Sequence, residues 1–219
     1  AQEAKESVLS ESTRTRAQKL SDPKQDDASK KSQYVIALDA GHGGKDEGAV
    51  SDDGKLEEKE YNLAVVKEIA RLLEQSGVKV YCTRTTDRTV PKKARVRLAN
   101  KRQADMLVSV HCNASDARKH SVRGIEVLYS KRDNGAGYTN KQLAAKLLKK
   151  TVAATGLPAR GVIRREDLYL MHHAKVPAVI VETGYLTNPS DCLYMRQEKG
   201  IRQTAWGIYQ AVMETLEKY

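Results

Sequence analysis

The chain of 219 residues lacks long hydrophobic runs. No segment approaches the roughly 20 consecutive apolar residues that a transmembrane helix needs, and none has the apolar core of a secretory signal. We therefore expect no membrane span in this chain, and its location has to be inferred from its function.

Cysteine is also scarce. The chain has three cysteines, Cys82, Cys112 and Cys192, which lie far apart. An odd number at this spacing is typical neither of a disulfide framework nor of a zinc site built from thiolates. Cys82 and Cys112 lie inside apolar runs, which favours buried free thiols. A single disulfide is the alternative.

Acidic residues are outnumbered by basic ones, 28 to 38, which gives a formal net charge of +10. Residues 1–33 contribute only +1 to this total, so the rest of the chain carries +9. Such an excess favours a polyanionic partner, such as an anionic wall polymer, although it also serves solubility. The chain has no zinc-finger spacing and no aromatic-rich strand motif, so we expect no nucleic-acid partner.

Residues 1–33 have few bulky apolar side chains and are rich in Ser, Gln, Lys, Glu and Asp. This composition predicts a disordered linker or tail. The remaining residues, 34–219, have the length of one domain.

Apolar runs and helical periodicity alternate along this domain. The runs predict strands at 34–39, 78–83, 106–110, 122–129 and 178–181. The periodicity predicts helices at 58–76, 91–103, 139–155, 189–196 and 199–218. Residues 159–175 are mixed, with a short apolar piece at 168–171. Continuously apolar strands between helices indicate an α/β fold of three layers, with a mostly parallel sheet flanked by helices.

Three of the predicted strands end at or near a polar residue that can take part in catalysis. His42 follows Leu38 in a glycine-rich turn, His111 follows Val110 directly, and Glu182 follows Val181 directly. Because function in open α/β sheets collects beyond the carboxyl ends of the strands, we expect these side chains to converge.

Two imidazoles and one carboxylate are a common catalytic zinc set, and a second carboxylate suits a general base. The sequence supplies two histidines and two carboxylates of this kind: His42, His111, Glu182 and one member of the acidic cluster at 57–60. His172 and His173 are a rival pair, but adjacent residues rarely coordinate one metal well. His120 lies in a charged loop and is expected to be solvated.

Six blocks resemble, in order and spacing, the zinc-dependent N-acetylmuramoyl-L-alanine amidases, the catalytic domain of bacterial division amidases and autolysins. The resemblance covers residues 34–217, and its blocks are VIALDAGHGGKDEGAV, EKEYNLA, TRTTDRTV, ARVRLANKRQADMLVSVHCNAS, GIEVLYS and VPAVIVETGYLTNPSD. It implies a zinc-exopeptidase-like (phosphorylase/hydrolase-like) fold. It also implies cleavage of the amide between N-acetylmuramic acid and the first L-Ala of the peptide stem, and therefore peptidoglycan as the substrate.

The resemblance also implies roles for single residues. His42, Glu58 and His111 match the zinc ligands, and Glu182 matches the catalytic glutamate. Glu57 is adjacent to Glu58 and is the alternative ligand. Further positions expected to support the site are Asp39, Arg95, Asn100 and Asn113. Arg164 and Arg165 are candidates to meet the carboxylates of the stem, but a solvated basic loop is the favoured interpretation for them. For Arg95 a helix-surface charge is the alternative.

Division enzymes of this family often carry a long insert that blocks the zinc. Here only about a dozen residues separate Leu157 from Leu168, so no blocking helix fits. We therefore expect an open groove and activity without an activator. Separately, we expect a monomer, and the function implied by the resemblance places a secreted protein in the cell wall or periplasm. The alternatives are a non-catalytic peptidoglycan-binding regulator and a zinc peptidase of similar fold.

Overall fold

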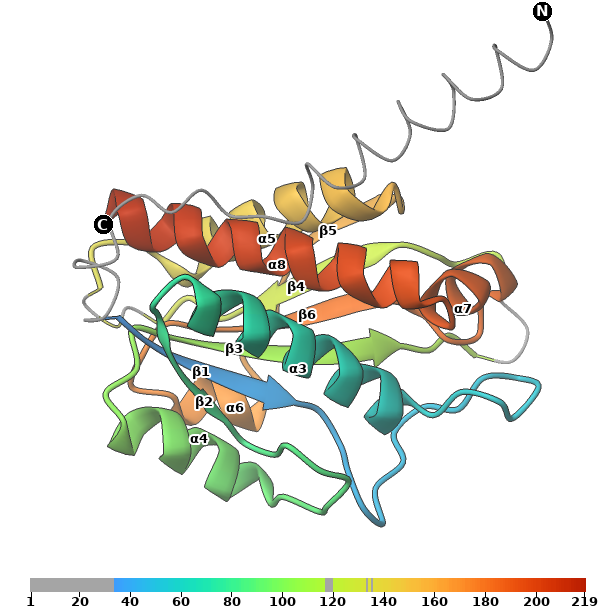
Figure 1. Ribbon diagram of the computed structural model, residues 1–219, viewed down its shortest axis with the longest axis horizontal. Helices are drawn as coiled ribbons and strands as arrows, with labels where there is room; N and C mark the ends of the chain where they lie inside the picture. The colour runs from blue at the N-terminus through green and yellow to red at the C-terminus, as the bar shows by residue number, and fades with distance from the viewer. Residues whose placement is uncertain (1–33, 117–119, 133, 135) are drawn as a thin grey trace, which may run out of the picture.

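The computed structural model describes residues 34–116, 120–132, 134 and 136–219 (Figure 1). The predicted tail at 1–33 lies outside these residues.

A six-stranded sheet forms the centre of the molecule, in the order β2-β1-β3-β6-β4-β5. Strand β4 runs antiparallel to β6, and the other neighbouring strands are parallel. The strands are β1 (Val35–Ala40), β2 (Lys79–Cys82), β3 (Met106–Asn113), β4 (Ile125–Tyr129), β5 (Ala159–Arg164) and β6 (Ala178–Tyr185). The mostly parallel sheet predicted from the sequence is confirmed.

Helices cover both faces of the sheet and complete three layers (Figure 1). One face is covered by α3 (Glu58–Gln75), α5 (Asn140–Thr155) and α8 (Glu198–Lys218). The other face carries α4 (Lys92–Lys101) and α6 (Tyr169–His173). The short helix α7 (Pro189–Met195) follows β6. Each helical layer packs its own apolar cluster against the sheet.

Helix α3 matters most for the site because it begins with Glu58. Its buried residues include Tyr61, Val65, Ile69 and Leu73, spaced at the helical repeat. Burying each large apolar side chain contributes roughly 1.5–3 kcal/mol, which fixes the helix against the sheet. A carboxylate in the first turn is also favoured by the helix dipole. The start of α3 is therefore a firm support for a side chain.

Two strands are longer than predicted. Strand β3 does not end at Val110 but continues to Asn113, and β6 continues past Val181 to Tyr185. His111 and Glu182 thus lie within paired strands, opposite each other in register. The polar side chains ended the apolar runs in the sequence, but the backbone ladder continues because alternate residues, such as Cys112 and Thr183, remain buried.

Strand β5 was not predicted at all. It pairs in parallel with β4 at the edge of the sheet, and its residues are exposed or half-buried. An edge strand of this kind has no continuous apolar face, so its sequence, ARGVIR, carries no strand periodicity. The short helix α6 accounts for the apolar piece at 168–171.

All three cysteines are free. Cys112 is buried, as predicted, whereas Cys82 is only half-buried. Among the described residues, none of the helices combines the length and apolar character needed to cross a bilayer.

Candidate metal centre

His42 is held in a tight turn that follows β1. Its backbone adopts a φ of 59°, a left-handed conformation that is uncommon for a residue with a side chain. Gly41 precedes it, and a Cβ atom there would lie 2.3 Å from the ring of His111. The glycine-rich sequence is therefore needed for the two histidines to approach each other.

Two arginines bind the carbonyl oxygens of this turn. Arg84 donates to the oxygens of Ala40 and Gly41 at 3.0 and 2.8 Å. Arg95 donates to the oxygens of Ala40 and His42 at 2.6 and 2.7 Å. Buried carbonyl groups that helix or sheet ladders cannot reach are thus satisfied by charged donors, which fixes the turn.

Arg95 is in turn fixed by Asp39, the only acidic residue of β1. The two side chains form a buried ion pair at 2.7 Å, and Ser109 and Thr83 each donate to Asp39 at 2.6 Å. Burial raises the pKa of Asp39, but the charge of Arg95 and the two hydroxyl groups outweigh it and lower the pKa. The alternative of a helix-surface charge for Arg95 is wrong.

Glu58 supplies the carboxylate of the cluster. Its Oε1 atom lies 2.9 Å from Nδ1 of His111 and 3.2 Å from Nε2 of His42. The backbone N–H groups of Cys112 and Ala49 donate to its two oxygens at 3.0 and 2.9 Å. A buried carboxylate held by backbone donors has little freedom to leave this position.

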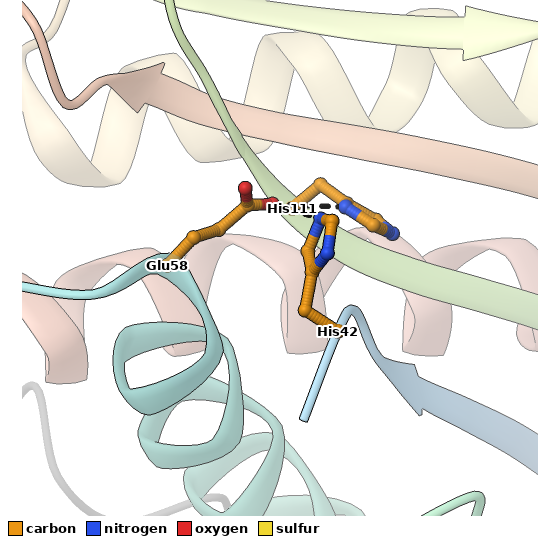
Figure 2. A group of neighbouring side chains, drawn as sticks. All are labelled: His42, Glu58 and His111. Atoms are coloured by element: carbon orange, nitrogen blue, oxygen red, sulfur yellow. Dashed lines mark hydrogen bonds and ion pairs between the residues drawn. The ribbon is translucent and has the colours of Figure 1, made fainter. Parts of the chain in front are cut away.

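The three side chains point toward one another from three elements, the turn after β1, the start of α3 and strand β3 (Figure 2). One candidate ligand atom from each of His42, Glu58 and His111 lies within 4.8 Å of the others. On the opposite side of its ring, His42 Nδ1 lies 2.8 Å from Asp46. A carboxylate behind a histidine is the usual partner of a metal-ligating imidazole, because it fixes the ring and its tautomer.

The protonation of the cluster reflects the concentrated negative charge. Burial lowers the pKa of His42, but the hydrogen bond and the charge of Glu58 outweigh it and raise the pKa to about 9. The pKa of His111 is raised for the same reason, and that of Glu58 is lowered by both histidines against the effect of burial. This environment attracts positive charge, and two imidazoles with one carboxylate are a donor set that zinc accepts. The residues present therefore fit a zinc ion.

Glu182 lies beside this cluster, opposite His111 on the neighbouring strand. Its Oε2 atom is buried and has no hydrogen-bond partner among the described residues. Burial raises the pKa of Glu182 to about 7. The charges of Glu58 and Glu126 add to the increase, and the charge of His111 opposes it. An unpartnered buried carboxylate oxygen is costly in a structural role and is typical of a functional one.

Sequence reasoning missed Asp46, which lies behind His42, and two further residues that hold the site. Glu126 of β4 faces Glu182 in register and binds Asn113, Arg160 and Tyr185 through its oxygens. Arg84, described above, is fully buried although it lies in a polar segment. Neither has a spacing signal, because their partners come from distant parts of the chain.

A pocket of about 300 Å³ lies beside the cluster, on the face of the sheet that carries α4 and α6. His42, His111 and Glu182 contribute to its wall, together with the apolar side chains of Leu128 and Ile180. Three cations, Lys92, Arg95 and Arg165, also line it. A substrate bound here would contact both the reactive groups and an apolar surface.

The other residues predicted for the site bind partners outside the cluster. Glu57 forms an ion pair with Lys59 at 3.0 Å and is not part of the cluster. Asn100 connects α4 to the backbone of His173 and Lys175. Arg164 and Arg165 are paired with Glu166 and Asp167.

The remaining histidines are outside the cluster. His172 and His173 lie in α6, where the ring of His173 stacks on Tyr169. His120 is exposed and contacts Asp52 at 3.0 Å. The structure thus brings together His42, Glu58 and His111, with Glu182 on the adjacent strand, and none of the rival histidines.

A three-layer α/β domain with histidines and carboxylates at the carboxyl edge of its sheet is typical of metal-dependent hydrolases. Comparison with known families is more specific. The chain belongs to the N-acetylmuramoyl-L-alanine amidase family, whose model matches residues 36–214.

Known relatives share both sequence and fold. N-acetylmuramoyl-L-alanine amidase LytC of Bacillus subtilis is 35% identical over 163 residues, which are 74% of this chain and 32% of LytC. The probable cell wall amidase LytH of Staphylococcus aureus is 34% identical over 187 residues, which are 84% of this chain and 58% of LytH. The chain therefore spans less than two thirds of either relative. The solved catalytic domain of CwlV, an N-acetylmuramoyl-L-alanine amidase of Paenibacillus polymyxa, superposes with a TM-score of 0.78 at 32% identity, covering 84% of this chain and 99% of that domain.

Proposed function

We propose that this chain is a peptidoglycan amidase that hydrolyses the bond between the lactyl group of N-acetylmuramic acid and L-Ala of the peptide stem. Membership of the amidase family supports the reaction class. The observation that carries the proposal is the unpartnered oxygen of Glu182 beside the His42, Glu58 and His111 cluster. Because the substrate is a wall polymer, the proposed place of action is outside the cytoplasmic membrane, in the cell wall or periplasm.

His42, Glu58 and His111 would hold the zinc ion. When bound, zinc polarises an amide carbonyl and lowers the pKa of water. The chain keeps His42 in place through Asp46 behind its ring, and through Arg84 and Arg95 on the turn. Backbone N–H groups of Ala49 and Cys112 hold the carboxylate of Glu58. No reorganisation of these groups is then required during the reaction.

Glu182 is the proposed general base and acid. It accepts a proton from the attacking water and returns it to the leaving amine of L-Ala, so that the amide C–N bond breaks while the carboxyl group and the free amine form. Its pKa of about 7 suits both steps near neutral pH, because a group titrating there can take up and release a proton. Glu126 supports this value by adding negative charge on the neighbouring strand.

The pocket gives the substrate its orientation in this proposal. Its apolar residues, which include Leu128 and Ile180, suit the methyl group of L-Ala and the aliphatic part of the stem. Fixing the scissile amide between this surface and the cluster contributes to the rate by proximity.

The substitution Glu182→Gln tests the assignment. We expect turnover of a soluble muramoyl peptide to fall at least about 1,000-fold, because the proton acceptor is lost. Zinc content should stay near that of the unchanged chain, since the three ligands are intact. A matched control is Glu166→Gln, which removes an exposed carboxylate outside the pocket lining and should leave turnover unchanged. Substantial activity in the Glu182→Gln chain would refute the assigned role.

A further inference from the structure

Helix α4 presents an exposed face of one charge sign. Among its residues and the one that follows it, Lys92, Lys93, Arg97, Lys101 and Arg102 are exposed, and the helix contains no acidic residue. Three of these, Lys93, Arg97 and Lys101, recur every four residues and therefore share one side of the helix. We call these three residues the basic stripe.

The basic stripe has no internal partner. None of its three side chains forms a hydrogen bond or ion pair with any residue in the described part of the chain. Some lysines of another helix do have a partner. On α5, Lys146 and Lys150 pair with Glu214 of α8 at 3.7 and 2.5 Å. The charges of the basic stripe are thus left for solvent or for a partner.

This arrangement is unfavourable for the isolated helix. Like charges four residues apart repel one another, and lysines in the first turn oppose the positive end of the helix dipole. The first turn of α4 has no acidic residue to offset Lys92 and Lys93. A bound polyanion would remove both costs at once.

The basic stripe begins next to the pocket that contains the reactive groups. Helix α4 lies beside α6 (Figure 1), on the face of the sheet that contains the pocket. Lys92, at its amino end, lines the pocket. From Lys93 to Lys101 the stripe then extends for about 12 Å away from it, at the helical rise per residue.

We propose that the basic stripe of α4 binds an anionic phosphodiester polymer attached to the cell wall, and so holds the pocket against the peptidoglycan that bears this polymer. The proposal rests on the proposed function, because it takes peptidoglycan as the substrate. A linear polymer with repeated phosphates matches a row of cations with regular spacing, and the release of counterions drives such binding.

Other occupants fit less well. A membrane surface requires bulky apolar side chains beside the cations, whereas the exposed residues of α4 are basic and its large apolar side chain Leu98 is half-buried. The segment at 1–33 carries a net charge of +1 and does not complement the stripe. A wall polymer is therefore the favoured partner.

The test compares two triple variants with equal loss of charge. The stripe variant carries Lys93→Gln, Arg97→Gln and Lys101→Gln. The control carries Lys141→Gln, Lys149→Gln and Lys199→Gln, at exposed positions of α5 and α8. Binding to purified poly(glycerol phosphate) is measured by titration at several salt concentrations, with phosphatidylglycerol vesicles and neutral dextran as comparison ligands.

We expect the stripe variant to lose affinity for poly(glycerol phosphate) by about 100-fold. The slope of the logarithm of the binding constant against the logarithm of the salt concentration should be smaller in magnitude by about 2. The affinity of the control should change by less than about threefold. Binding to sacculi should fall when phosphodiester polymers are stripped with hydrofluoric acid. An equal loss in both variants, no loss in the stripe variant, or tighter binding to the vesicles than to the polymer would overturn the proposal.

Cleavage of a small soluble muramoyl peptide separates this proposal from the catalytic one. The stripe residues do not line the pocket, so turnover of that substrate should be unchanged in the stripe variant. Absence of turnover in the unchanged chain, together with stripe-dependent polymer binding, would contradict the amidase function and support the docking surface.

Discussion

Glu57 and Glu58 are neighbours in the chain, yet their side chains meet different partners. Glu58 lies within 3.2 Å of both histidines, whereas Glu57 pairs with Lys59. The sequence left the two open because a shift of one residue preserves the acidic character of the cluster. Only the helix start at Glu58 decides which carboxylate faces inward.

This difference gives a prediction for metal binding. Glu58→Gln should weaken zinc affinity by about 100-fold or more, since it removes a ligand charge rather than a supporting contact. Glu57→Gln, the matched control one residue away, should retain the affinity of the unchanged chain. Competition titration with a chromogenic chelator measures both, and the reverse order of effects would move the ligand to Glu57.

The second prediction at this scale concerns the buried pair of Asp39 and Arg95. Asp39→Asn leaves the Arg95 charge buried without its partner, which should lower the free energy of unfolding by about 3–5 kcal/mol. Glu68→Gln, which breaks the exposed pair with Arg71, should change it by less than about 1 kcal/mol. Urea denaturation of both variants at pH 7 provides the comparison, and equal effects would contradict the structural role of Asp39.

The pH dependence of this effect has a defined sign. The pKa of Asp39 is lower in the folded chain than its ordinary value, so its stabilising contribution is complete above the unfolded value of about 4. That contribution is lost as the pH falls through the folded value. The stability difference between the unchanged chain and Asp39→Asn should therefore shrink in acid, and a difference that grows in acid would reverse the argument.

At the scale of elements, the turn after β1 depends on a glycine that packs against a histidine. A Cβ atom at position 41 would lie within 2.6 Å of three atoms of the His111 ring. Gly41→Ala should therefore displace His111 and reduce zinc affinity by at least about tenfold, in the range seen when the support of a ligand is removed. Zinc titration and far-UV circular dichroism together test this. Unchanged affinity in a folded chain would show that the turn adapts.

The elements also show where sequence reasoning succeeds. Helix α3 and strands β1, β3 and β6 were predicted because each has a continuous apolar face or run that the core requires. Strand β5 was missed because it lies at the sheet edge, where its hydrogen bonds to β4, not its side chains, define it. Strands β3 and β6 were predicted to end too early, because polar side chains at the site interrupt the apolar pattern.

The same limit applies to the candidate site. His42, His111 and Glu182 were predicted from their places after apolar runs, but Arg84 and Glu126 were not. Several of their interactions join segments more than twenty residues apart, such as Arg84 with Lys59 and Glu126 with Tyr185. No local spacing can report a contact of that kind.

At the scale of the whole molecule, one face of the sheet supports most of the apolar core and the other face carries the pocket. The layer of α3, α5 and α8 covers the larger apolar cluster, whereas the layer of α4 and α6 leaves room for the pocket. Between Leu157 and Leu168 the chain forms β5 and no helix that could cover the cluster. The proposed amidase should therefore act without an activating partner.

The most direct test of the amidase proposal is mass spectrometry of the products released from purified sacculi by the 219-residue chain alone, supplied with zinc. We expect peptide stems that begin with L-Ala carrying a free amine, and glycan strands that keep the free lactyl carboxyl group. Release of stems cut within the peptide would instead indicate a peptidase. Sacculi that remain uncut, with zinc bound, would contradict the catalytic account.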